Sequence, residues 1–156
     1  MYTNIMIAVD GSNESLQAVR EALTLIGRGL RAEIALVNVQ EPASWVQLAT
    51  HDSDAIATAA VEAGEHLMGQ AAALLDAAGV GYSMEVMLGE PGTALVDMAE
   101  QLNADMVMLG ARGMGAIKSA LVGSVSKDVI HRCLCPVLVV RVPPEPEVFD
   151  EQEAAS

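Results

Sequence analysis

Five short strand-like runs, separated by four segments of helical spacing, constrain the fold of this chain more than any other feature. The runs cover residues 5–9, 34–39, 82–87, 106–109 and 137–142. Apolar strands that alternate with helices are typical of a parallel sheet covered by helices on both faces. We therefore predict an α/β fold: a three-layer, doubly wound sandwich around a five-stranded parallel sheet of strand order 3-2-1-4-5.

Helices are predicted near residues 16–26, 55–78, 91–102 and 124–131, where apolar side chains recur every three or four positions. Pro91 suits the first turn of the third helix. A polar stretch from Gln40 to Asp54 is longer than a minimal connection between a strand and a helix. We interpret this stretch as a candidate functional lid.

Two unusual turns should meet at one edge of this sheet. Ligands of doubly wound folds bind beyond the carboxyl ends of the strands, where the strand order reverses. With the predicted order, this reversal lies between the first and fourth strands. Asp10-Gly11-Ser12 follows the first strand, and a glycine-rich loop follows the fourth. The sequence therefore predicts a ligand crevice formed by both turns.

The glycine-rich loop has the spacing Gly110-x2-Gly113-x9-Gly123-Ser124. This layout is typical of a loop whose backbone N–H groups surround phosphates, with a helix N-terminus next to it that attracts anions. It is not a Walker A loop, because Ile117 stands where that motif requires glycine. It also lacks the third glycine of the dinucleotide fingerprint and follows the wrong strand.

Composition argues against several partners. The formal net charge is −13, with 8 basic and 21 acidic residues, so we expect no nucleic-acid partner and no membrane insertion. No apolar stretch approaches the length of a membrane span, and the N-terminus lacks the basic start of a secretion signal. We expect a cytoplasmic protein with one domain over residues 1–142 and an acidic, proline-containing, disordered tail over residues 143–156.

The cysteines and histidines form no evident catalytic or metal site. Cys133 and Cys135 are separated by one residue, so they point to opposite sides or are too strained to form a disulfide. We interpret them as small buried or half-buried packing residues, with a redox or metal role as the alternative. Glu62 and His66 share a helical face, but such a pair is usually a surface pair.

The chain resembles universal stress proteins of the ATP-binding subgroup over about residues 2–142. The resemblance is carried by Ala8-Val9-Asp10-Gly11-Ser12, Gly89-Glu90-Pro91, the glycine signature, and Cys135-Pro136-Val137-Leu138-Val139-Val140. It implies that the bound cofactor is ATP, ADP or AMP. It also implies Mg²⁺ held mainly by phosphate oxygens and water, with Asp10 as the one candidate protein ligand.

The resemblance implies a role for each end of the nucleotide. Asp10 would approach the ribose or the metal–phosphate region, or would simply cap the following helix. Val39, with Asn38, would offer backbone groups to the adenine edge. The resemblance also implies that Ala8, Val9 and Ser12 bind the nucleotide.

The glycine loop and the helix after it would hold the phosphates. Gly110, Gly113 and Gly115 would let the main chain approach phosphate without an intervening Cβ. Ser124 would bind phosphate while capping the helix, or would only cap it, and Val125 would add a backbone N–H group. Three further candidates are Arg112, which pairs with phosphate or is solvated, Met114, which packs on the ligand or fills space, and Gly123, which opens the helix.

These implications favour an ATP-binding stress-response or regulatory protein that acts through nucleotide-dependent association with a regulatory protein partner. We expect it not to be an enzyme beyond slow ATP hydrolysis. Two alternatives stay open: a nucleotidyl-transferring or pyrophosphate-releasing enzyme of the same superfamily, and a nucleotide-free interaction module. Strand 137–142 is expected to be an exposed apolar edge, which favours association because such an edge is normally covered. The resemblance implies that this strand pairs with the same strand of a second copy, in a homodimer or a tetramer.

Overall fold

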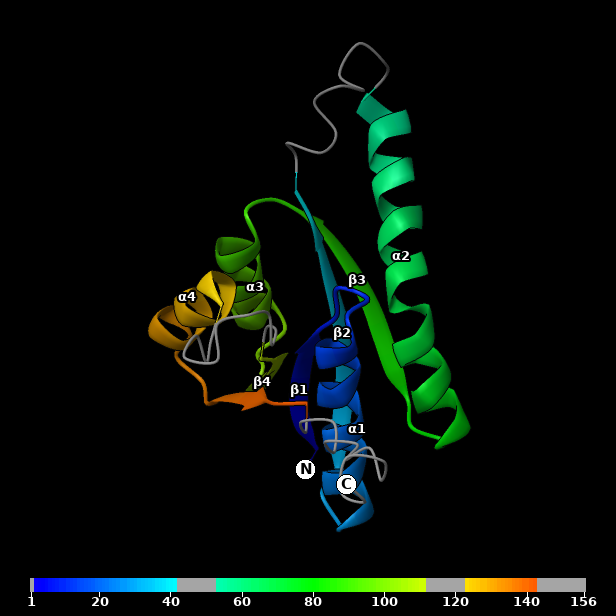
Figure 1. Ribbon diagram of the computed structural model, residues 1–156, viewed down its shortest axis with the longest axis vertical. Helices are drawn as coiled ribbons and strands as arrows, with labels where there is room; N and C mark the ends of the chain where they lie inside the picture. The colour runs from blue at the N-terminus through cyan, green and yellow to red at the C-terminus, as the bar shows by residue number, and fades with distance from the viewer. Residues whose placement is uncertain (1, 42–52, 112–122, 143–156) are drawn as a thin grey trace, which may run out of the picture.

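A computed structural model describes residues 2–41, 53–111 and 123–142 of the 156-residue chain (Figure 1). Its elements follow each other in strict alternation of strand and helix. They are β1 (Thr3–Ala8), α1 (Asn13–Gly27), β2 (Ala32–Gln40), α2 (Ser53–Ala77), β3 (Tyr82–Leu88), α3 (Pro91–Gln101), β4 (Met106–Gly110), α4 (Ser124–Arg132) and β5 (Val137–Val140).

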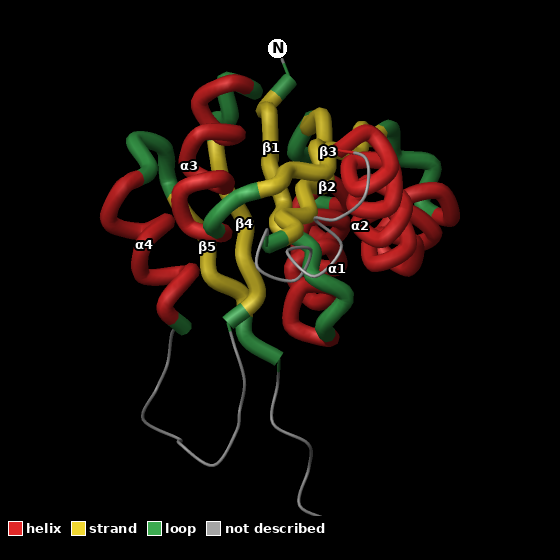
Figure 2. The backbone as a smooth tube through the Cα atoms, turned by 90° about the horizontal axis from the view of Figure 1, so that it is seen from above, coloured by secondary structure: helices red, strands yellow, loops and turns green. Residues whose placement is uncertain are grey.

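The five strands form one parallel sheet of order β3-β2-β1-β4-β5, which confirms the predicted topology. Helices α1 and α2 lie on one face of this sheet, and α3 and α4 lie on the other (Figures 1 and 2). The sheet is therefore the middle layer of the predicted three-layer sandwich.

Alternating side chains of the central strands build a separate apolar core on each face. Ile7 and Leu36 pack beneath α1 and α2, whereas Met6 and Val37 pack beneath α3 and α4, and none of the four is accessible to solvent. The strands read as continuous apolar runs in the sequence because both faces are buried.

The last strand is shorter than predicted. Strand β5 ends at Val140 rather than at residue 142, because its partner β4 ends at Gly110, the residue paired with Val140. The Ala111 amide then donates a final hydrogen bond of 2.7 Å to the Val140 carbonyl. The candidate lid beyond Glu41 and the predicted tail at 143–156 lie outside the described residues, apart from Ser53 and Asp54, which begin α2.

Candidate nucleotide crevice

A cavity of about 630 Å³ lies at the carboxyl ends of β1, β2 and β4. Most of the predicted site residues that the structure describes line it: Ala8, Val9, Asp10, Ser12, Val39, Gly110, Gly123, Ser124 and Val125. Arg112, Gly113, Met114 and Gly115 lie outside the described residues. The turn after β1 and the two described glycines of the signature thus meet in one crevice, as the strand order requires.

Three helices begin at this cavity. Its lining includes residues of the first turns of α1, α3 and α4. The N–H groups of a first helical turn have no acceptor within the helix, and the helix dipole makes this end positive. How each of the three ends is capped therefore decides where an anion can bind.

The first turn of α1 is capped by the Ser12 side chain, and Asp10 supports the turn before it. The Ser12 hydroxyl accepts a hydrogen bond of 3.2 Å from the Ser15 backbone N–H, and Asp10 Oδ1 accepts one of 2.9 Å from the Ser12 N–H. Ser15 Oγ also donates to the Ser12 carbonyl at 2.9 Å. Asp10 is therefore part of the turn that starts α1, as well as an exposed lining residue of the crevice.

The first turn of α3 is capped by a carboxylate. Glu90 Oε1 accepts from the Gly92 N–H at 3.1 Å, and Glu90 Oε2 accepts from the Thr93 N–H at 2.8 Å. These backbone bonds, led by the one from Thr93, hold the pKa of the Glu90 carboxyl below its ordinary value. The anion position of α3 is thus filled by a residue of the chain itself.

The first turn of α4 differs from the other two. Its N-cap is Gly123, in an extended conformation, and no side chain caps it within the described residues. The prediction that Ser124 caps this helix is wrong, because Ser124 already has helical geometry as the first residue of α4. The N–H groups of Ser124, Val125 and Ser126 therefore begin a helix whose end opens on the cavity.

Gly110 has a structural reason to be glycine that sequence reasoning missed. A Cβ at this position would lie 2.7 Å from the backbone nitrogen of Ser15 and closer still to the backbone of Glu14. The space that the absent side chain leaves is therefore taken by the first turn of α1. Gly110 also lines the cavity, so its backbone stands between α1 and the crevice.

Asn38 is buried behind the crevice rather than in its lining. Asn38 is only 2% exposed. Its Nδ2 donates a hydrogen bond of 2.8 Å to the Val9 carbonyl, and its Oδ1 accepts one of 2.6 Å from Gln40 Nε2. The neighbouring Val39 lines the cavity. The Asn38 side chain therefore fixes the end of β2 against the segment after β1.

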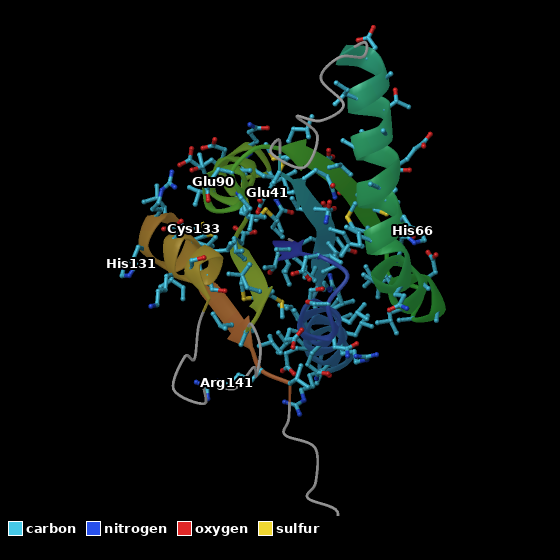
Figure 3. All side chains as sticks on the ribbon, turned by 45° about the horizontal axis from the view of Figure 1, so that its top comes forward. Glu41, His66, Glu90, His131, Cys133 and Arg141 are labelled. Carbon is cyan, nitrogen blue, oxygen red and sulfur yellow. The ribbon has the colours of Figure 1, made fainter. Side chains whose placement is uncertain are left out.

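The described lining is acidic. It contains the carboxylates of Asp10, Glu14, Glu41 and Glu90, and within residues 2–41, 53–111 and 123–142 it includes no lysine or arginine. Figure 3 shows Glu41 and Glu90 at the same end of the molecule. Sequence reasoning did not select Glu14 or Glu41. Their positions could have indicated them, because Glu14 lies in the first turn of α1 and Glu41 directly follows β2.

No metal site is formed by the protein alone in the described parts of the chain, where no three His, Cys, Asp or Glu side chains gather suitably for an ion. The acidic groups of the crevice are spread around its wall. A divalent cation there would depend on oxygen atoms from a ligand, with Asp10 as the predicted protein contact.

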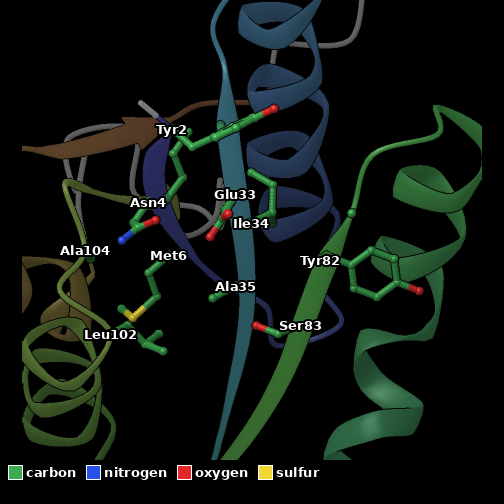
Figure 4. A pocket seen from close by; sticks show the side chains of 13 residues that line it. Tyr2, Asn4, Met6, Glu33, Ile34, Ala35, Tyr82, Ser83, Leu102 and Ala104 are labelled. Carbon is green, nitrogen blue, oxygen red and sulfur yellow. The ribbon is translucent and has the colours of Figure 1, made fainter.

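A second cavity, of about 500 Å³, lies at the opposite edge of the sheet (Figure 4). Asn4 and Met6 of β1, Glu33 and Ala35 of β2, and Ser83 of β3 line it, together with other residues near the amino ends of these strands. No predicted site residue belongs to it. Ligands of doubly wound sheets bind at the other edge, so the crevice is the better candidate site.

The two cysteines are partly buried and pack against the apolar core beneath α3 and α4, as predicted for packing residues, and both line one small cleft. Cys133, Leu134 and Cys135 all line this cleft beside α3, and Leu134 is 94% exposed. Burial, followed by the nearby Cys135 thiol, raises the pKa of Cys133, so this thiol stays protonated at neutral pH.

Among the helices that the structure describes, none combines the length and the apolar character needed to cross a bilayer. Residues 1–141 match the model of the universal stress protein family. A universal stress protein of Methanocaldococcus jannaschii is 31% identical over 144 residues, which span 92% of this chain and 84% of that protein.

Solved structures with this fold include proteins with bound nucleotides. The structure of hypothetical protein MJ0577 has a TM-score of 0.77 at 23% identity and covers 93% of this chain and 99% of its own. A universal stress protein in complex with cAMP has a TM-score of 0.63 at 26% identity, with 90% and 97% coverage. An Arabidopsis thaliana family protein with AMP bound has a TM-score of 0.66 at 20% identity, with 96% and 99% coverage.

Proposed function

This chain belongs to the universal stress protein family, and we propose that its crevice binds an adenine nucleotide. The observation that carries the proposal is the uncapped N-terminus of α4, which opens on a cavity at the reversal point of the sheet. Backbone N–H groups and a helix dipole at such a place attract a phosphate group. Structural relatives with cAMP and AMP bound support an adenine nucleotide as the ligand.

The proposal assigns each part of the nucleotide to a part of the crevice. The phosphate group nearest the ribose lies at the start of α4, where Ser124 and Val125 contribute N–H groups and Ser124 its hydroxyl. The adenine edge meets the backbone of Val39, and Asp10 approaches the ribose or a metal-bound phosphate. These lining residues come from three separate elements that the sheet holds together.

We extend the proposal to ATP, bound with Mg²⁺, and to binding rather than catalysis. The described lining contains no lysine or arginine to stabilise a transferred phosphoryl group. ATP hydrolysis is accordingly slow. The protein instead acts in the cytoplasm as a regulatory stress protein whose nucleotide state changes its association with a protein partner. A nucleotidyl-transferring enzyme would release pyrophosphate in the presence of an acceptor, and we expect none.

We also propose a homodimer through β5. This strand pairs only with β4 in the described sheet, so its other edge has open backbone groups. Leu138 on the strand is 37% exposed, and Leu134 just before it is 94% exposed. An apolar edge of this kind is usually covered by another chain.

The test compares two substitutions of one residue. Ser124→Glu places a carboxylate at the first position of α4, where it favours the helix but repels phosphate. Ser124→Gln has nearly the same size and no charge. In equilibrium dialysis with AMP and with Mg²⁺ and ATP, we expect the glutamate variant to lose at least about tenfold in affinity relative to the glutamine variant. Equal affinities would place the phosphate elsewhere, and no binding to the unmodified chain at millimolar nucleotide would refute the function.

A further inference from the structure

The cavity at the amino ends of the strands lies over a row of side chains that crosses three strands (Figure 4). Met6, Ala35 and Ser83 are paired across β1, β2 and β3, so their side chains lie on one face of the sheet. Met6 belongs to the core beneath α3 and α4, which identifies that face. Ala35 and Ser83 have short side chains and leave space above the sheet that longer side chains would fill.

Helix α3 covers the same face farther along the strands but ends before this cavity. Val37 and Met87, toward the carboxyl ends of β2 and β3, join the core beneath the helix. Helix α3 ends at Gln101, and its C-cap Leu102 and the nearby Ala104 form one wall of the cavity. The cavity volume, about 500 Å³, is within the usual range for the binding site of a small molecule.

The charges at this cavity are negative. Glu33 pairs with Asn4 in the sheet, so its exposed carboxylate lies on the same face as the Asn4 amide. Beside them, Asp105 Oδ2 accepts a hydrogen bond of 2.7 Å from the Asn4 backbone N–H. The end of α3 at Leu102 contributes the negative end of the helix dipole. Within the described residues, no lysine, arginine or histidine lines the cavity, so its charge is complementary to a cation.

We propose that this cavity is a second ligand site and that its ligand is a small organic cation, with an ammonium or guanidinium group on a slim apolar body. The cationic group pairs with the Glu33 carboxylate, which has no ion-pair partner among the described residues. The apolar body lies over Ala35, beside the Ser83 hydroxyl. Tyr82 leaves this space open, because its ring points toward α2 (Figure 4).

The site is separate from the nucleotide crevice. The two cavities lie at opposite edges of the sheet and have no lining residue in common. The inference therefore goes beyond nucleotide binding and does not depend on it. The negative charges that favour a cation here also disfavour a phosphate group.

The probe is phenethylamine, a cation at neutral pH, and its matched control is phenethyl alcohol, which has the same body without the charge. Each is titrated into the ¹⁵N-labelled full chain and followed by amide NMR spectra. We expect millimolar binding with the largest shifts at Ala35, Ser83 and Ala104, and no shifts at Ser124 and Val125 in the crevice. The amine should bind at least about threefold more tightly than the alcohol.

Three variants test the roles of charge and space. Glu33→Gln removes the charge at an exposed position, so the amine and the alcohol should then bind within about twofold of each other. Glu65→Gln, exposed on α2 and outside the lining, makes the same change in net charge and should keep the preference. Ser83→Leu, at an exposed position on β3, fills the cavity and should weaken both probes at least about threefold.

The absence of shifts at Ala35 and Ser83 with millimolar phenethylamine would overturn the site. Equal binding of the two probes to the unmodified chain, or a preference that survives Glu33→Gln, would overturn the cation as its ligand. Loss of the preference in both Glu33→Gln and Glu65→Gln would mean a general attraction to an acidic protein and would overturn the proposal as well. A preference lost only in Glu33→Gln, with both probes weakened by Ser83→Leu, supports it.

Discussion

Asn38 donates its side-chain amide to the carbonyl oxygen of Val9 over 2.8 Å, and so joins the end of β2 to the segment that leads from β1 into the crevice. The same side chain accepts from Gln40 Nε2 at 2.6 Å. Asn38 is only 2% exposed. Without these bonds, its side-chain amide and the Val9 carbonyl would therefore need other hydrogen-bond partners in a buried place. A buried amide that is bonded at both its nitrogen and its oxygen holds two walls of the proposed site in place.

Asn38→Ala should therefore lower the free energy of unfolding by about 2 kcal/mol, because it leaves the buried Val9 carbonyl without its donor. Urea denaturation measures this loss. Gln101→Ala, at the exposed end of α3, is the control and should change stability by less than about 0.5 kcal/mol. Equal stabilities of the two variants would show that the Asn38–Val9 bond contributes nothing.

Two glycines of α2 should respond to alanine with opposite signs. A Cβ at Gly64 would lie 2.6 Å from Val86 Cγ2 on β3, whereas a Cβ at Gly69 meets no atom within 4 Å. Gly64→Ala should thus destabilise by about 1–3 kcal/mol through overpacking. Gly69→Ala should stabilise by roughly 0.5–1 kcal/mol through helix propensity. Thermal unfolding of the pair measures both, and a shared sign would mean that α2 does not lie against β3 as described.

Glu90 should make stability depend on acid pH. The pKa of this carboxyl is lowered from its ordinary value of 4.5. Its ionised form therefore stabilises the folded chain at pH values above the ordinary pKa. The contribution is lost as pH falls through the lowered folded pKa. The unmodified chain should therefore exceed Glu90→Gln in urea midpoint at pH 7, and the gap should close in more acidic buffer. A gap that persists unchanged at low pH would mean that the cap does not depend on the carboxylate charge; Glu100→Gln serves as the control.

The proposed dimer has a matched test on the two edges of the sheet. Leu138 on β5 is 37% exposed and Leu88 on β3 is 46% exposed. Leu138→Lys should shift the chain toward monomer in analytical ultracentrifugation, because it places a charge in the proposed interface. Leu88→Lys should leave the dimer intact. Dissociation by the second substitution alone would move the interface to β3.

The order of the sheet was predictable because local patterns and topology agree. Five strand-like runs alternating with helical segments allow few parallel arrangements, and the handedness of crossovers removes most of them. The meeting of Asp10 with Gly123 at one crevice followed from that order. The end of β5 at Val140 could not be predicted from the apolar run, because the strand stops where the neighbouring strand β4 stops.

Details within the crevice depend on contacts between segments far apart in the chain. The sequence shows a glycine at 110, but only the fold shows that the first turn of α1 occupies the place of its side chain. Glu90 before Pro91 predicts a helix start, yet not that both carboxylate oxygens bond to the backbone. The preference of serine for N-caps suggested Ser124, whereas the backbone places the cap one residue earlier, at Gly123.

The most direct test of the central claim is a titration of ¹⁵N-labelled protein with AMP, followed by amide NMR spectra. If phosphate binds at the open end of α4, the largest shifts are expected at Ser124, Val125 and Ser126, with saturation at one AMP per chain. Ala35 and Ser83, which line the opposite cavity, should not move. Shifts confined to Ala35 and Ser83, or no shifts at millimolar AMP, would contradict a phosphate site at the start of α4.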